Sequence, residues 1–399
     1  MKPPRRRAPV CQPGQPVPKW GNMHVVQLGS DDSVFRTGAP SDTLKRQLDY
    51  GRVLAELRPG AQMTFLAFSR NRGARAFQRE NVRFVPVLGS RLTQPIALIR
   101  ALAAIHRRQP IDVVSSQSPF EDGWATLAFG KAYRIPTVAQ IHFDIFSPFA
   151  ARGGRFPALS RARTALGIRS LRHYTAIRCV GHGIKRAIVD RGLHHAVSVI
   201  PVPVTMTPKE RDPNPSRVLY VGRLDPQKRM RDWLHVAAAV LKQRPGTMFD
   251  IVGDGADRAD LEALARSLGI AGSVQFHGFV PYDRLPDFYG RAAVFLLTSG
   301  YEGLARVLVE AQLHEVPCIA TRVSGAEDAI EHGRTGFVHD IGDIRGMAES
   351  VARLLDDRDT NMRMGREGAA LMRERFEPNA LARQWMMLLL SAAERGSET

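Results

Sequence analysis

The chain has 399 residues, of which 44% are hydrophobic and 24% charged, and its 56 Lys and Arg against 39 Asp and Glu give a formal net charge of +17. This is the composition of an ordinary globular protein, but the length exceeds what one compact core accommodates, so we expect two domains. The three cysteines, Cys11, Cys179 and Cys318, lie far apart and form no CxxC motif. We therefore expect neither a disulfide framework nor a zinc knuckle, and a reducing compartment.

The positive charge is concentrated in the N-terminal half. Residues 1–200 hold 31 basic and 11 acidic side chains, or +20, whereas residues 201–399 hold 25 and 28, or −3. Residues 1–20 are basic and proline-rich, which predicts a flexible tail, and they lack the apolar core of a secretory signal. No run of about eighteen apolar residues follows, as a spanning helix would require. We therefore expect a cytoplasmic protein.

Residues 145–189 contain no acidic side chain. They contain nine basic ones: Arg152, Arg155, Arg161, Arg163, Arg169, Arg172, Arg178, Lys185 and Arg186. Such a run is either a solvated surface or a surface for an anionic partner. A helix over 155–171 would group Leu159, Ala162 and Leu166 on a narrow apolar face, which favours shallow docking on the anionic inner face of the cell membrane. Nucleic acid is disfavoured, because aromatic residues make up only 7% of the chain and none alternate with the arginines.

Short apolar runs that alternate with amphipathic segments predict βαβ units and parallel sheets. The expected strands of the first half are 24–28, 63–68, 82–87, 112–116, 137–142 and 175–180. Those of the second half are 217–222, 248–253, 273–278, 293–298, 317–321 and 335–340. The pattern predicts an α/β protein with two doubly wound Rossmann-like domains, 21–204 and 217–375, that face a cleft. A polar, proline-rich linker at 205–216 joins them, and a helix at 376–399 follows.

A basic cluster follows the first strand of the second series, in VGRLDPQKRMRDW (221–233). Arg223 comes just after the strand, and we expect Lys228, Arg229 and Arg231 in the first turn of the next helix. Cations there oppose the helix dipole. An anion held by Arg223, Lys228 and backbone N–H groups would compensate, which predicts a phosphate site. The alternative is an exposed basic turn.

Single residues further along the chain are ambiguous by themselves. Gly253 and Gly278 end two strands, as turn residues do or as residues that let the backbone approach a nucleoside. Glu302 and Glu310 bracket an apolar run, and His142 closes a strand. Isolated glutamates near a helix start are more often caps, and such a histidine is more often structural.

The order and spacing of five motifs over 217–340 resemble the donor domain of the retaining GT-B glycosyltransferases of family 4, or group 1. The motifs are VGRLDPQK, IVGDG, SVQFHGFVP, SGYEGLARVLVEAQLHEVPCIAT and SGAEDAIEHGRTGFV. IPTVAQIHFD and IRCVGHGIKRAIVDRG resemble parts of the N-terminal domain of that family. The resemblance implies a GT-B fold with an acceptor-side N-terminal domain, a donor-binding C-terminal domain, and a last helix that crosses back to the N-terminal domain.

The resemblance also implies a role for each matched residue. Arg223 and Lys228 would neutralise the pyrophosphate of the sugar nucleotide in place of a metal ion. Glu310 would bind the ribose, Glu302 would lie beside the donor sugar, and His142 would lie near the sugar hydroxyls and the reacting centre. Further residues of the implied donor site are Gly253, Gly278, Gly303, Leu304 and Ala305.

The chain departs from the family pattern at a few positions. Leu304 and Ala305 replace Phe-Gly, although the small Ala305 still permits close approach of a donor. Glu315 stands where a glycine is common, and Asp328 takes the position of a glutamate.

We therefore expect a retaining, metal-independent glycosyltransferase (EC 2.4 type) without a cofactor. It would move a sugar from a nucleoside-diphosphate sugar to a hydroxyl of a glycan or lipid-linked acceptor, in surface polysaccharide or glycolipid synthesis. A small soluble acceptor competes with this expectation. A nucleotide-sugar epimerase of the same fold and a non-enzymatic nucleotide or nucleic-acid binder are the alternative functions.

Overall fold

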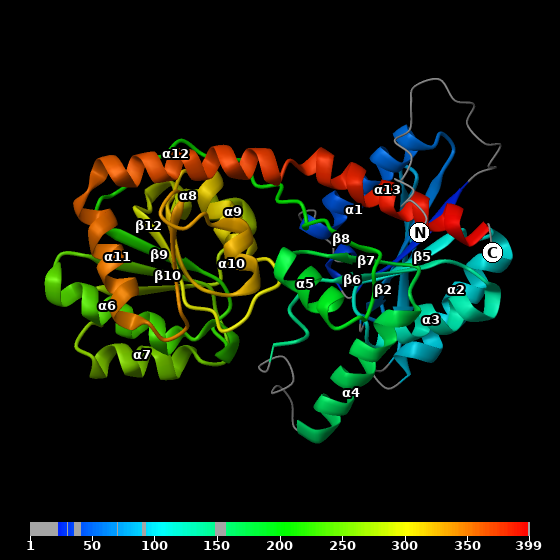
Figure 1. Ribbon diagram of the computed structural model, residues 1–399, viewed down its shortest axis with the longest axis horizontal. Coiled ribbons are helices and arrows are strands. Elements are labelled where there is room, and N and C mark those ends of the chain that lie inside the picture. Colours follow the sequence, from blue (N-terminus) through cyan, green and yellow to red (C-terminus); the bar gives the residue numbers. More distant parts are fainter. Residues whose placement is uncertain are drawn as a thin grey trace, which may run out of the picture.

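The computed structural model of the protein describes residues 23–29, 31–35, 41–69, 71–89, 93–147 and 157–397. The expected flexible tail, 1–20, lies outside these residues, as do Cys11, Arg152 and Arg155. The described chain forms two α/β domains side by side, and the last two long helices run across both (Figure 1). The predicted fold class, two doubly wound domains, is confirmed. None of the described helices is long and apolar enough to cross a membrane.

The first domain is built on an eight-stranded sheet with the order β3-β4-β2-β1-β5-β6-β7-β8. The strands are β1 (His24–Gly29), β2 (Gln62–Ser69), β3 (Phe77–Arg79), β4 (Val82–Leu88), β5 (Val113–Ser116), β6 (Thr137–Ile141), β7 (Ala176–Cys179) and β8 (Val197–Val199). All neighbours are parallel except β3 and β4. Strand order reverses at β1, between β2 and β5, and ligands of such sheets bind at this switch point.

Helices cover both faces of the first sheet. They are α1 (Asp42–Leu57), α2 (Gln94–Arg108), α3 (Glu121–Tyr133), α4 (Pro157–Ser170) and α5 (His182–Asp190), with the 3₁₀ turns η1 (Ser33–Phe35) and η2 (Leu171–His173). Successive strand residues point to opposite faces, so Val25 packs in the core that contains α1, and Val26 in the core that contains α2 and α3. The hydroxyl of Ser41 caps α1 by accepting the N–H of Leu44 at 3.1 Å, which fixes the helix start beside the second domain.

The second domain has a six-stranded parallel sheet with the order β11-β10-β9-β12-β13-β14. Its strands are β9 (Arg217–Val221), β10 (Met248–Val252), β11 (Val274–Gly278), β12 (Val294–Leu297), β13 (Cys318–Thr321) and β14 (Gly336–His339). Its helices are α6 (Met230–Gln243), α7 (Arg258–Ser267), α8 (Leu285–Arg291), α9 (Arg306–Leu313), α10 (Ser324–Ala329), α11 (Ile344–Asp356) and α12 (Arg358–Arg375), with η3 (Pro226–Lys228) and η4 (Tyr282–Arg284).

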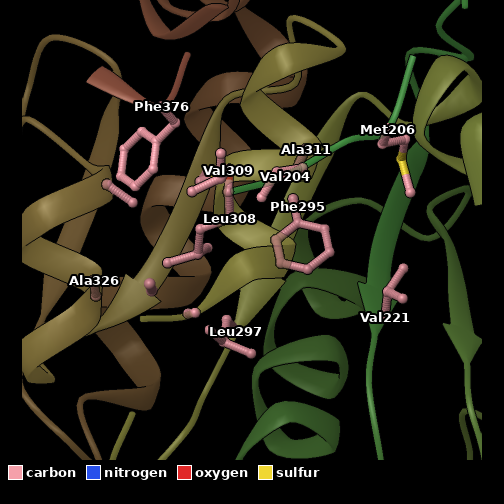
Figure 2. Packing of buried hydrophobic residues seen from close by; sticks show 14 of the residues in the cluster. Val204, Met206, Val221, Phe295, Leu297, Leu308, Val309, Ala311, Ala326 and Phe376 are labelled. Carbon is pink, nitrogen blue, oxygen red and sulfur yellow. The ribbon is translucent and has the colours of Figure 1, made fainter. Parts of the chain in front are cut away.

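The core of the second domain continues into the segment that joins the domains. Figure 2 labels Phe295 of β12 and Leu308 of α9, which belong to one buried cluster. Val204 and Met206, from the strand-free stretch 201–216, belong to the same cluster and are 3% and 7% exposed. The connection between the domains is therefore packed against the core of the molecule over part of its length.

The chain returns to the first domain at its last helix, α13 (Pro378–Ser397), which packs on α1, β5 and β6 (Figure 1). The fully buried Trp385 anchors it, because its indole N–H donates to Oε1 of Gln27 in β1 at 3.2 Å. The two domains are thus joined twice, near residues 205 and 377.

Candidate functional site

The backbone segments at the carboxyl ends of β9, β10 and β11 lie close together at Gly222, Gly253 and Gly278. A Cβ on Gly253, whose φ is +135°, would lie 1.8 Å from the carbonyl oxygen of Gly222. The N–H of Gly253 donates to the carbonyl of Gly278 at 2.8 Å, and Gly278 has a φ of +71°. Backbone packing within the chain therefore already requires glycine here. Contact of Gly253 and Gly278 with a nucleoside stays a prediction.

The prediction that Lys228 lies in the first turn of α6 is wrong. Pro226 opens a separate 3₁₀ turn that ends at Lys228, and Arg229 is the N-cap of α6 with a φ of +48°. Arg229 pairs with Asp232, in the first turn of α6, at 2.6 Å. The carboxylate of Asp232 thus already lies at the positive end of the helix dipole. The dipole of α6 therefore no longer predicts a bound anion.

Lys228 instead meets Glu302, 74 residues away in sequence. Its Nζ lies 2.6 Å from Glu302 Oε1, and the two side chains are 13% and 8% exposed. Ser299 donates its hydroxyl to the same oxygen at 2.7 Å, and the N–H of Gly300 donates to the carbonyl of Gln227 at 2.8 Å. The loops that follow the neighbouring strands β9 and β12 therefore form one unit around a nearly buried ion pair.

Arg223 differs from Lys228 in its exposure. Its side chain is 74% exposed and pairs with Asp225 at 3.1 Å. The carbonyl of Arg223 accepts the hydroxyl of Tyr220 at 2.8 Å, which fixes its backbone. A long, exposed guanidinium on a fixed backbone can turn toward a phosphate at low cost.

Glu310 lies on α9 and is 4% exposed. It accepts the hydroxyls of Tyr289 at 3.0 Å and Tyr282 at 3.4 Å, and Arg306 lies 3.8 Å away. Burial raises the pKa of Glu310. A ribose that bound Glu310, as the family resemblance implies, would have to share this carboxylate with the two tyrosines.

Arg306, at the start of α9, connects the domains. Its guanidinium pairs with Asp42 at the start of α1 at 3.1 Å. Burial opposes the charge of Arg306, but Asp42 and Glu310 outweigh it and raise the pKa of the guanidinium. Arg306 is therefore charged at every physiological pH.

His142 follows β6 and faces the second domain. Its Nε2 is buried and has no hydrogen-bond partner among the described residues. Burial, with Arg178 and Arg46 nearby, lowers the pKa of His142 to about 3, so the ring is neutral. A Cβ on Gly303 would lie 2.0 Å from the carbonyl oxygen of His142. The loop 299–305 thus holds Glu302 against Lys228 and Gly303 against His142.

A second contact between the domains involves Asp328, one of the departures from the family pattern. Its carboxylate accepts the backbone N–H of His182 at 2.9 Å and lies 2.8 Å from the Nδ1 of the same residue. Both contacts join α10 of the second domain to the start of α5 in the first. The facing edges of the two domains are therefore in contact.

A cavity of about 380 Å³ lies beside His142 between the domains. Sequence reasoning missed four residues that line it: Arg46, Gln47, Arg178 and Arg306. Arg178 had been assigned to the basic run, but it is not a surface residue, because β7 holds it at 1% exposure. An arginine inside the apolar strand TAIRCV was the available signal. No sequence signal marks Arg46 and Gln47, because only the placement of α1 brings them to the cavity.

Among the described residues, no group of three His, Cys, Asp or Glu side chains is placed to hold a metal ion. Cys179 and Cys318 are free thiols and buried. Arg223 and Lys228 are the two cations that the family resemblance assigns to the donor phosphate.

Two family models match adjoining parts of the chain. Residues 50–208 match the model described as Glycosyltransferase Family 4, and residues 205–370 match that described as Glycosyl transferases group 1. The matched ranges meet at the segment that joins the two domains. The chain belongs to the family 4, or group 1, glycosyltransferases.

Individual relatives agree with this family. Alpha-D-kanosaminyltransferase of Streptomyces kanamyceticus is 33% identical over 167 residues, 42% of this chain and 43% of that protein. The lipopolysaccharide core biosynthesis glycosyltransferase LpsE of Rhizobium meliloti is 26% identical over 228 residues, 55% of this chain and 65% of that protein. The chain thus spans less than two thirds of each.

A solved structure resembles the whole described molecule. Sucrose-phosphate synthase from Thermosynechococcus elongatus superposes with a TM-score of 0.75 at 18% identity, over 92% of this chain and 98% of that one. At this identity the likeness establishes the fold alone, which is GT-B.

Proposed function

We propose that the protein transfers a sugar from a nucleoside-diphosphate sugar to a hydroxyl group of an acceptor. The loop 299–305 carries this proposal, because it places Glu302 on Lys228 in the donor-side domain and Gly303 on the backbone of His142 in the acceptor-side domain. A sugar bound at the carboxyl ends of β9 and β12 would therefore face the first domain.

In the proposed reaction, the bond between the anomeric carbon and the β-phosphate oxygen breaks, and a bond from the acceptor oxygen to that carbon forms. The acceptor attacks from the side of the leaving group, so configuration is retained, and its proton passes to the departing diphosphate. Negative charge grows on the diphosphate, where Lys228 and Arg223 would stabilise it without a metal ion. Glu302 would offset the positive charge of the sugar ring, and the neutral His142 would hydrogen-bond its hydroxyls.

The acceptor class is a glycan or a lipid-linked glycan in the synthesis of surface polysaccharide or glycolipid. The relative named for lipopolysaccharide core biosynthesis supports this part of the proposal. So does the surface of α4, which projects from the first domain (Figure 1). Its Leu159 and Leu166 are 68% and 54% exposed.

Helix α4 would dock this enzyme on the anionic inner face of the cell membrane. Arg169 on α4 is exposed one turn after Leu166, and Arg161 is exposed on the other side of the helix, whereas Arg163 is bound to Glu121 at 2.7 Å. Exposed leucines with basic neighbours suit shallow contact with anionic headgroups. Sedimentation with vesicles that contain an anionic lipid should occur at low salt and be lost at high salt. R169E should weaken it, and R345E, on the far domain, should not. Equal sedimentation with neutral vesicles contradicts the docking.

The activity is tested with UDP-, GDP- and ADP-sugars. One conjugate should raise the melting temperature of the protein, and free nucleoside diphosphate should form when an acceptor is added. An epimerase would convert the sugar nucleotide without an acceptor, and a binding protein would keep its function in E302Q. K228A should lower turnover ~10–1,000-fold, as the loss of a charge-assisted contact in the transition state does. Unchanged turnover rejects the phosphate role of Lys228.

A further inference from the structure

The cavity beside His142 has a strongly unbalanced set of polar side chains. Among its thirteen described lining residues, Arg46, Arg178 and Arg306 carry guanidinium groups and none carries a carboxylate. Its volume of about 380 Å³ is in the range of small-molecule sites, ~300–1,000 Å³.

Of the three arginines that line the cavity, Arg178 is the one without a counter-ion among the described residues. It donates to the carbonyls of Ile200 at 2.8 Å and Pro201 at 2.7 Å and to Oε1 of Gln140 at 3.2 Å. The indole of Trp385 lies 4.7 Å below its guanidinium. No described carboxylate pairs with Arg178, although burying an unpaired charge is costly. An anionic ligand in the cavity would supply that counter-ion.

The other two arginines share one acid. Arg46 and Arg306 both pair with Asp42, at 2.7 Å and 3.1 Å. Asp42 is outside the lining, and Arg306 also faces Glu310 at 3.8 Å. The negative charge thus lies behind the two guanidinium groups, so the cavity itself keeps a positive potential that favours an anion.

Two lining groups are suited to hydroxyls. Oε1 of Gln47 is buried without a hydrogen-bond partner among the described residues, and Gln47 is 1% exposed. Nε2 of the neutral His142 is likewise without a partner. Leaving a buried acceptor unpaired is costly, and a hydrogen bond from a hydroxyl of a ligand would remove that cost.

We propose that this cavity binds the acceptor, and that the acceptor is a polyhydroxy ring that carries an oxyanion, either phosphate or carboxylate. The proposal rests on the proposed sugar transfer and specifies its acceptor. The oxyanion lies among Arg46, Arg178 and Arg306, and the hydroxyls lie at Gln47 and His142. The guanidinium group is planar and binds either oxyanion with two parallel N–H donors.

The position of the cavity assigns it to the acceptor. Eleven of its thirteen lining residues belong to the first domain, and only Leu304 and Arg306 belong to the second. Arg223 and Lys228, the expected phosphate ligands of the donor, are not among them. His142 lines the cavity and touches Gly303 of the donor-side loop, so an acceptor bound here lies next to the reacting centre.

The test measures binding to the full chain without donor, by calorimetry and thermal shift. The probes are a hexose 6-phosphate, a hexuronate, a neutral methyl hexoside and inorganic phosphate. We expect one of the two anionic sugars to bind at least tenfold more tightly than the neutral sugar and than inorganic phosphate. Which of them binds distinguishes phosphate from carboxylate. R46Q and Q47E should each weaken that binding at least tenfold, whereas R345Q, on an exposed arginine of α11, should not change it.

Several results overturn this proposal. Equal affinity for neutral and anionic sugars removes the need for an oxyanion, and tight binding of inorganic phosphate alone makes the cavity a simple phosphate site. If R46Q and Q47E both leave the binding unchanged, the sugar binds at another place on the protein. If a nucleoside-diphosphate hexuronate binds more tightly than the matching hexose conjugate, and R46Q removes the difference, the oxyanion belongs to the donor. Failure of the sugar transfer itself is seen separately, as loss of any response to sugar nucleotides.

Discussion

The ion pair between Lys228 and Glu302 allows structural and catalytic effects to be separated in one set of variants. K228M leaves Glu302, 8% exposed, with only the hydroxyl of Ser299 as a hydrogen-bond partner. Leaving one partner of a buried pair without the other costs ~3–5 kcal/mol, and we expect about 3 kcal/mol because the two side chains keep some exposure to solvent. E302Q should cost less, ~1–2 kcal/mol, since the longer Lys228 can turn toward solvent.

The double variant K228M/E302Q should recover part of the loss. With no charge left to strand, we expect a favourable coupling free energy of ~1–3 kcal/mol between the two changes. The assay is urea unfolding of the transition that involves the second domain, in all four proteins. Turnover with the sugar nucleotide identified by thermal shift is measured in parallel.

The two readouts should diverge. Stability returns in the double variant, whereas turnover stays at the level of K228M, because the cation that faces the diphosphate is still missing. Additive destabilisation in the double variant would refute the ion-pair reasoning. Turnover that recovers together with stability would show that Lys228 acts only on the fold.

Three further changes address pH and domain contacts. Burial raises the pKa of Asp122, in α3, from 3.8 to about 6. The stability that the folded protein gains from keeping this carboxyl protonated is therefore full below about pH 4 and is lost as the pH rises through about 6. D122N should therefore gain up to ~3 kcal/mol relative to the wild type between pH 4 and 7, and a pH-independent difference in urea unfolding contradicts this. G303A should lower turnover at least tenfold and separate the domains in small-angle scattering, because its Cβ overlaps the His142 carbonyl; unchanged scattering and turnover argue against the contact. D328A removes both bonds to His182 and should widen the scattering envelope with the second-domain unfolding midpoint unchanged; a shifted midpoint would place its role inside that domain.

The fold was predictable because buried parallel strands are apolar on both faces and read as uninterrupted hydrophobic runs. All twelve expected strands are present. Two strands were missed. β3 has three residues, FQR, of which two are exposed, and β8 has three, VSV, of which one is buried, so neither offers such a run. The error at Lys228 has a local cause as well, since Pro226 begins a short turn before α6.

The candidate site was predictable only in part. Motif spacing indicated His142, Lys228 and Glu302, and the structure places them on facing loops. The lining of the cavity depends instead on long-range packing. Gln47 reaches it from α1, and its unpaired Oε1 becomes visible only when every neighbour is in place. Arg178 was grouped with surface arginines because charge counting ignores which residues of a strand are buried.

The path of the last helix sets the order in which the first domain is completed during synthesis. Trp385 of α13 lies against the guanidinium of Arg178 and donates a hydrogen bond to Gln27 of β1. Trp385 and Gln27 are 358 residues apart in the sequence. Domains generally begin to fold as they leave the ribosome, the N-terminal one first. Here the part of the eight-stranded sheet at β5 and β6 that α13 covers stays uncovered until the whole second domain and α13 have emerged. The core of the first domain is therefore complete only when the end of α13 has been synthesised.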